Sequence, residues 1–153
     1  MNTSYLRTAN SRGGAAVVEA AIILPLLVLI AIGGIDVGQY INLSQTVTNA
    51  SREGARLASR DSHESVADVE AGVLHLIQDA FEHVSESTIA NATTIVVRGA
   101  DGTVVPNGDL TLVESGDPLS VEVTLDYSAF RWINGANYWS ADNQSKVTVC
   151  RRE

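Results

Sequence analysis

Residues 12–36 read Arg-Gly-Gly-Ala-Ala-Val-Val-Glu-Ala-Ala-Ile-Ile-Leu-Pro-Leu-Leu-Val-Leu-Ile-Ala-Ile-Gly-Gly-Ile-Asp, which is the longest apolar run of the chain. Between Ala15 and Ile35 the only charged residue is Glu19. At about 1.5 Å per residue, a helix over this segment spans about 31 Å, the thickness of the hydrocarbon core of a bilayer. Because a backbone in lipid must satisfy its own hydrogen bonds, we predict a membrane-spanning helix over residues 15–35, with a kink or loosened turn near Pro25.

The charges on either side of this segment predict its orientation. Arg7 and Arg12 are the only charged residues before Ala15, whereas 17 acids and 8 lysines or arginines follow from Asp36 onward. Because positive charge is retained on the cytoplasmic side, we expect residues 1–14 to be a cytoplasmic leader and the acidic remainder to lie across the membrane. A formal net charge of -8 without a basic cluster also argues against a nucleic acid partner.

The residues that follow the apolar run continue a helical pattern. Between residues 36 and 60 there is no proline, and apolar or small residues recur every three or four positions. These residues, which we call the packing stripe, are Tyr40, Leu43, Val47, Ala50, Gly54 and Leu57. The spacing predicts a helix extension over residues 36–60. Gly34 and Gly38 would let another helix approach closely, although glycine is common in membrane helices in general.

Residues 61–153 have the pattern of one small extracytoplasmic domain. An apolar face with helical period predicts an amphipathic helix over about residues 64–84, with Ser62 or Ser65 as its N-cap. Short runs rich in β-branched residues then alternate with turn residues, which predicts strands. The runs are 94–98, 103–105, 110–114, 119–127 and 146–150. We therefore expect an α+β fold: a long N-terminal membrane-spanning helix, a second helix and a small antiparallel sheet.

No pattern in this domain indicates catalysis. It lacks a Ser-His-Asp, Cys-His, paired-acid or phosphate-loop constellation, so we expect no enzyme activity, no cofactor and no metal. His75, Asp79 and His83 are spaced four apart and could form the edge of a metal site. No fourth ligand accompanies them, and a solvated helix face is the simpler interpretation.

Two further features of the domain have two interpretations each. Trp132, Tyr138 and Trp139 are either part of its core or a patch that binds a sugar or a partner. Cys150 is the only cysteine, so no intrachain disulfide is possible. It is either an ordinary buried strand residue or one half of an intermolecular disulfide.

Glu19 is the most informative single residue, because a carboxylate inside an apolar span is costly and is a functional-site hypothesis by default. It is the fifth residue after Gly14. If a protease cut after Gly14, the new α-amino group of Ala15 would lie about one helical turn from Glu19, and the amine of a neighbouring subunit could pair with the carboxylate. Alternatively, Glu19 reaches the lipid headgroups from near the end of the helix.

These motifs form an ordered set along the chain. The set is Arg12-Gly13-Gly14, Val18-Glu19, Pro25, Asp36-Val37-Gly38 and Asn49-Ala50-Ser51-Arg52-Glu53-Gly54-Ala55-Arg56. Over these residues the chain resembles the TadE-like minor pilins, or pseudopilins, of tight-adherence (Flp-type) pili. The resemblance implies cleavage by a prepilin peptidase between Gly14 and Ala15, on the cytoplasmic face of the inner membrane. It also implies that Glu19 and Pro25 act in recognition and assembly.

The partners implied by the resemblance are the membrane, the prepilin peptidase, other pilin subunits and the pilus assembly machinery. The chain would stay in the membrane as a single-pass protein or enter a surface pilus that mediates adhesion. One residue departs from the pattern: many relatives carry an aromatic residue directly after the glutamate, whereas this chain has Ala20. This departure puts the efficiency of cleavage in question.

Two functional hypotheses follow. In the first, the chain is a minor pilin whose subunits associate through the apolar helix and the packing stripe. In the second, it is a single-pass, signal-anchored envelope protein whose outer domain binds a ligand or a partner. Removal of the leader distinguishes them, because a simple anchor needs no processing after Gly14.

Overall fold

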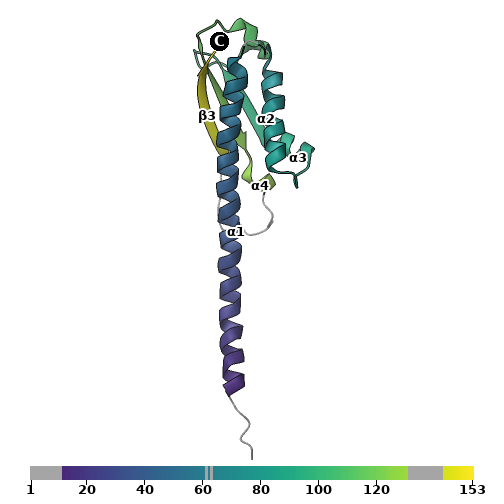
Figure 1. Ribbon diagram of the computed structural model, residues 1–153, viewed down its shortest axis with the longest axis vertical. Helices are drawn as coiled ribbons and strands as arrows, with labels where there is room; N and C mark the ends of the chain where they lie inside the picture. The colour runs from purple at the N-terminus through teal and green to yellow at the C-terminus, as the bar shows by residue number, and fades with distance from the viewer. Residues whose placement is uncertain (1–11, 61, 63, 131–142) are drawn as a thin grey trace, which may run out of the picture. The chain divides into compact units, whose positions relative to one another are not determined.

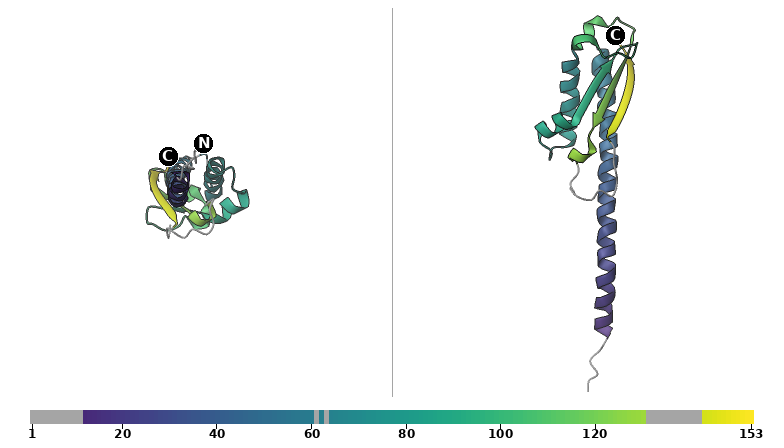
Figure 2. Two further views of the ribbon diagram at one scale, coloured as in Figure 1. Left: turned by 90° about the horizontal axis from the view of Figure 1, so that it is seen from below. Right: turned by 180° about the vertical axis from the view of Figure 1, so that it is seen from behind.

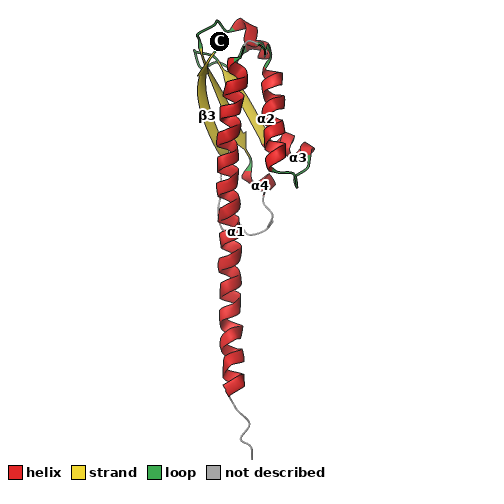
Figure 3. Cartoon of the chain, viewed as in Figure 1, coloured by secondary structure: helices red, strands yellow, loops and turns green. Residues whose placement is uncertain are grey.

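The computed structural model describes residues 12–60, 62, 64–130 and 143–153 (Figure 1). The chain divides into two compact units, Met1–Val37 and Gly38–Glu153. Helix α1 (Arg12–Ser59) contributes to both units. Further helices and a three-stranded antiparallel sheet follow it, so the predicted α+β fold with a long N-terminal apolar helix is confirmed (Figure 3). Trp132, Tyr138 and Trp139 lie outside the described residues.

The first unit consists, in its described part, of the beginning of α1. Its apolar side chains are exposed, for example Ile22 and Ile30, at 71% and 64% relative accessibility. The helix is long and apolar enough to cross a membrane. It also runs without interruption through Pro25, so the kink or loosened turn expected there does not break it.

The second unit has two layers. The part of α1 that starts at Gly38 and helix α2 (Val66–Ala80) cover one face of a sheet with the strand order β1-β2-β3 (Figures 1 and 2). The strands are β1 (Thr93–Arg98), β2 (Pro118–Leu125) and β3 (Gln144–Arg151). The connections contain α3 (Glu86–Ala92), α4 (Tyr127–Phe130) and two 3-10 turns, η1 (Pro106–Gly108) and η2 (Leu110–Leu112).

The core of this unit lies between the helices and the central strand. Leu119, Val121, Val123 and Leu125 are buried on β2, as the alternation in the sequence predicts. The helices bury Leu43, Val47, Ala50, Leu57, Val69, Val73 and Ile77 against them. At Gly54, α1 lies close to both the sheet and α2, because a Cβ atom there would lie 3.0 Å from side-chain atoms of both Val121 and Val73.

Helix α2 is shorter than predicted and is followed by a helix that was not predicted. The helix expected over residues 64–84 spans Val66–Ala80, and Ser65, one of the two expected caps, accepts a hydrogen bond from the Asp68 amide at 3.3 Å. The Ser85 side chain caps α3 in the same way, through the amide of Thr88.

Two of the five predicted strands are wrong. In the run 103–105, Val104 forms only an isolated bridge with Arg98. In the run 110–114, the chain turns into η2, because the Asp109 carboxylate accepts a hydrogen bond from the Thr111 amide at 2.9 Å. The other three runs are strands, although β2 ends at Leu125, before α4 begins.

Candidate functional site

The residues predicted to be cleaved and to direct assembly lie at the start of α1. Gly14, Ala15, Glu19 and Pro25 are exposed in the structure. Apart from its own helical turn, no described residue comes within 4 Å of the point where Gly14 would carry a Cβ. Because Ala15 and Glu19 are four residues apart on one continuous helix, they share a face and stand one turn apart. This surface is therefore open to a peptidase or to a second helix.

The two glycines that follow the apolar run are also open. Gly34 belongs to the first unit, and Gly38 begins the second. Neither would bring a Cβ atom within 4 Å of another group. Each position can therefore accept the close approach of another backbone.

The packing stripe, unlike the residues of the predicted cleavage site, is largely buried. Leu43, Val47, Gly54 and Leu57 are buried in the core of the second unit. Their partners include α2, where a Cβ atom on Gly72 would lie 2.5 Å from Leu57 Cδ1. These side chains therefore already have intramolecular partners.

Tyr40, at the start of the stripe, remains 38% exposed. Its ring stands edge-on to the Tyr127 ring, with 5.6 Å between the centroids. Its hydroxyl accepts a hydrogen bond from Gln144 Nε2 at 2.9 Å. Tyr40 thus joins α1 to both α4 and β3.

Two residues that tie α1 to the rest of the second unit were not anticipated from the sequence. Ser51 is buried, and its hydroxyl lies 2.6 Å from Thr148 Oγ1 and 3.3 Å from the carbonyl oxygen of Val121. Arg152 is only 6% exposed, and its Nη1 donates hydrogen bonds to the carbonyl oxygens of Ala58 at 3.0 Å and Arg60 at 2.9 Å. The C-terminal arginine therefore caps the end of α1, and no local sequence signal connects residues so far apart.

The outward face of α1 carries charged residues. The Arg56 guanidinium pairs with Glu53, with Nε 2.8 Å from Oε2. This hydrogen bond lowers the pKa of Glu53 and raises that of Arg56. Because both side chains are partly exposed, the pair contributes little to stability, and its effect is to orient Arg56.

His75, Asp79 and His83 do not form the metal edge considered above. His75 Nδ1 lies 3.3 Å from Asp79 Oδ2, with both side chains largely exposed. Helix α2 ends at Ala80, so His83 is not on the same helix. Over the described residues, no three His, Cys, Asp or Glu side chains come close enough together to hold a metal ion.

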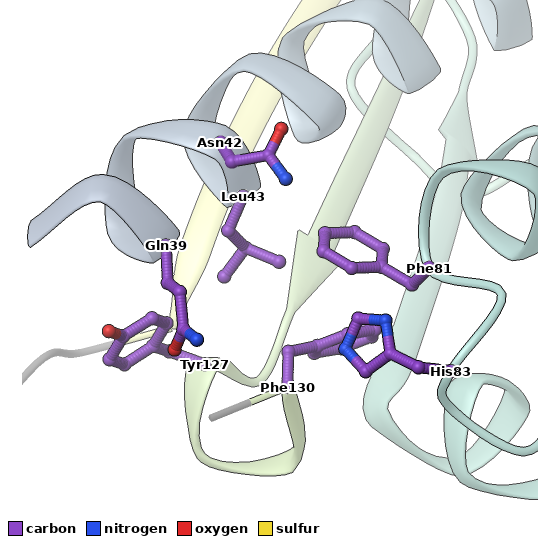
Figure 4. A pocket seen from close by; sticks show the side chains of 7 residues that line it. All are labelled: Gln39, Asn42, Leu43, Phe81, His83, Tyr127 and Phe130. Carbon is purple, nitrogen blue, oxygen red and sulfur yellow. The ribbon is translucent and has the colours of Figure 1, made fainter. Parts of the chain in front are cut away.

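A small hollow lies where α1, the segment after α2 and α4 meet (Figure 4). It has a volume of about 140 Å³ and is lined by Gln39, Asn42, Leu43, Phe81, His83, Tyr127 and Phe130. Pockets for organic ligands usually measure about 300–1,000 Å³. The rings of Phe81 and Phe130 pack 4.8 Å apart at its wall, so the hollow suits internal packing better than ligand recognition.

Cys150 lies on β3, half-buried beside the core. Burial raises the pKa of its thiol above the ordinary value. At neutral pH the side chain is therefore a thiol rather than the reactive thiolate.

The fold and the exposed helix define an α+β chain with one N-terminal apolar helix that can anchor it in a membrane. Residues 14–56 match the model of a family described as TadE-like protein. The match confirms the resemblance to TadE-like proteins and connects the chain with Tad pilus systems. It ends inside α1, so α2 and the sheet lie outside it. No curated protein and no solved structure matches the chain.

Proposed function

We propose that the chain is a membrane-anchored minor pilin, or pseudopilin, that takes part in assembling a tight-adherence pilus and so in surface adhesion. The observation that carries the proposal is the continuity of α1, which runs from the motif around Gly14 through an exposed apolar segment into the core of the second unit. One helix is thus both the anchor and part of the folded unit. The proposed role is structural and involves no catalysis.

The proposed mechanism begins with removal of the leader. A prepilin peptidase cuts after Gly14 at the cytoplasmic face of the inner membrane, and the new α-amino group of Ala15 becomes the first charge of the mature helix. Glu19 of one subunit then pairs with the amine of a neighbouring pilin while their apolar helices pack together. The second unit lies on the extracytoplasmic side, and the assembly machinery supplies the other partners.

The first experiment determines the N-terminus of the membrane-extracted protein from cells with and without the prepilin peptidase. We expect a start at Ala15 only when the peptidase is present. A start at Met1 or Asn2 in both strains would contradict the proposal and support the signal-anchored alternative. The hollow in Figure 4, with a volume of about 140 Å³, is smaller than an ordinary ligand pocket and does not itself support that alternative.

The second experiment tests Glu19. Removing one partner of a desolvated ion pair costs about 3–5 kcal/mol, so Glu19→Ala should insert into the membrane normally but assemble poorly. Glu114→Ala is the matched control, because it removes an exposed carboxylate that lies in the second unit, outside the apolar segment. Normal piliation by Glu19→Ala at a normal protein level would remove the role given to this carboxylate.

A further inference from the structure

The outward faces of α1 and α2 in the second unit carry opposite charges. On α1 and directly after it, exposed arginines recur every four residues; this basic stripe is Arg52, Arg56 and Arg60. Four exposed acids lie on α2 or within two residues of its ends; this acidic stripe is Glu64, Asp68, Asp79 and Glu82. Residues 61–97 hold seven acids and no lysine or arginine.

Both stripes belong to one surface. Gly54 approaches Val121 of β2 and Val73 of α2 at the same distance, so the two helices lie on the same side of the sheet. Figures 1 and 2 show the two helices side by side on the sheet, so the residues that they leave exposed face away from the sheet together. We call this surface the helical face.

The two helices run antiparallel, and this determines where the charged residues lie along the common helix direction. Leu57 lies against Gly72, whereas Leu43 lines the same hollow as Phe81. At 1.5 Å per residue, Arg60 is therefore near the level of Asp68, and the other arginines are level with the middle of α2. Arg60 thus stands beside Asp68, and Arg52 and Arg56 lie between the levels of Asp68 and Asp79.

Within one copy the stripes do not pair with each other. Among the described residues, the ion pairs on this face join Arg56 to Glu53 and His75 to Asp79, each within one helix, and none joins α1 to α2. Between the acids, α2 exposes the small residues Ala67 and Ala71. These alanines leave room for the long side chains of arginines from another molecule.

We propose that the helical face is an interface between two copies of this chain, in which the basic stripe of each copy contacts the acidic stripe of the other. A two-fold axis parallel to the helices brings α1 of each copy opposite α2 of its partner, so the surface is self-complementary. The same axis leaves α1 pointing in the same direction in both copies, as two proteins anchored in one membrane require. This inference deepens the proposed function and rests on its membrane anchoring, but it uses neither leader cleavage nor Glu19.

The size of the surface predicts how strong the contact is. Helix α2 has 15 residues and is about 22 Å long, and two adjacent helices are about 20 Å wide, which gives roughly 450 Å² per copy. A stable dimer usually buries about 800 Å² per partner. The contact is therefore weak in solution and forms where membrane anchoring raises the effective concentration. Because it depends on exposed charges, added salt weakens it.

The geometry is tested by crosslinking the full chain in membranes. All copies carry Cys150→Ser, which removes the native thiol. One set of copies then carries Asn49→Cys and another carries Gln78→Cys, each with its own tag. The two sets are co-expressed, and their membranes are treated with a short bismaleimide. The two positions lie at nearly the same level on α1 and α2, so the mixed 49–78 pair should dominate. The proposal would be overturned if the 49–78 product were no more abundant than the 49–49 and 78–78 products. The complete absence of a 49–78 product would overturn it as well.

Charge reversal then tests the chemistry with the same crosslink. Copies that all carry Arg52→Glu and Arg56→Glu should lose the product about tenfold, as should copies that all carry Asp68→Lys and Asp79→Lys. Mixing one kind with the other should restore it, because each reversed stripe again meets its opposite. The matched control reverses Lys146 and Arg151 together, two exposed cations on β3, and should leave crosslinking unchanged.

Each outcome of the mixing experiment is decisive. The proposal would be overturned if the charge-reversed copies crosslink like the wild type, or if mixing the two kinds fails to restore the crosslinked product. Resistance of every variant to protease in the same membranes shows that the second unit is folded. The N-terminus is sequenced from these membranes as well. A start at Ala15 without the crosslink rejects this interface alone, whereas an unprocessed start with the crosslink rejects the pilin route alone.

Discussion

The capping of α1 by Arg152 predicts that the second-last residue of the chain is one of the most important for stability. Its Nη1 donates to the carbonyl oxygens of Ala58 and Arg60 at 3.0 and 2.9 Å, in the turn where a helix has no intrahelical donors left. The neighbouring backbone adds a hydrogen bond from the Glu153 amide to the Ser59 carbonyl oxygen at 2.8 Å. The positive charge also suits the C-terminal end of the helix dipole.

The expected magnitude follows from these contacts. A hydrogen bond to a charged group contributes about 1.5–3 kcal/mol, and a buried acceptor left without a donor loses its desolvation energy in full. Arg152→Ala removes two such bonds at a side chain that is only 6% exposed, and after partial replacement by water we expect a loss of about 2–4 kcal/mol. Arg152→Lys keeps the charge without the planar fork, so it should lose about half as much.

Urea titration of the full chain in detergent, followed by a short protease pulse, measures this loss. The second unit is cleaved only where it has unfolded, and with an m-value of about 1.5 kcal/mol/M the midpoint should fall by about 1–3 M. Arg151→Ala is the matched control, because this neighbouring arginine is exposed on β3. If Arg152→Ala and Arg151→Ala shift the midpoint equally, the capping of α1 does not stabilise the unit and the reasoning fails.

Three other predictions concern the second unit. Gly54→Val should lower its stability by about 2–3 kcal/mol in the same titration, because the new side chain meets Val121 and Val73 where α1 lies close to both; Gly34→Val, which has no such neighbour within 4 Å, should not. Maleimide should modify Cys150 more slowly in the folded chain than in urea at pH 7, since burial raises its pKa, and equal rates would contradict this. Hydrogen bonds from Thr111 lower the pKa of Asp109, so its stabilising effect should be complete above pH 3.8 and lost as the pH falls through the lowered pKa; urea midpoints of wild type and Asp109→Ala should therefore converge in acid.

The parts of the fold that could be predicted from sequence have signals within one element. The apolar run and the stripe that follows it extend without a helix breaker apart from Pro25, and α1 spans both. Ser65 has the residue type of an N-cap directly before an apolar helical period, and it caps α2. The strict alternation from Leu119 to Leu125 predicted which face of β2 is buried.

The two wrong strand predictions concern residues that have strand-forming side chains but are not paired along their length with another strand. Val104 and its neighbours have strand-forming side chains, but they gain only one bridge to Arg98 beyond the edge of β1. Leu110 is fully buried without being part of a strand, because the turn that Asp109 starts delivers it to the core. β-Propensity describes the fit of a side chain to a pleated surface, and neither run is paired along its length with a neighbouring strand.

The cap of α1 could not be predicted for a related reason. Arg152 follows a strand at the end of the chain, where a basic residue is ordinarily solvated. Its burial depends on the antiparallel pairing of β2 with β3, which returns the C-terminus to the end of α1. Only the assembled sheet brings these two ends together.

The periodicity of the packing stripe does not say which partner it packs against, whereas the structure does. Apolar residues at three- and four-residue spacing need a partner, but the pattern is the same for a second subunit and for another element of the same chain. In this molecule Leu57 and Gly54 meet Gly72 and Val73 of α2, so the inward side of α1 beyond Gly38 is fully used. A contact between copies along this part of α1 must therefore use its outward side, where Arg52 and Arg56 take the place of apolar residues. In the interface proposed above, the association there is electrostatic, and α2 of the other copy supplies the acidic partner.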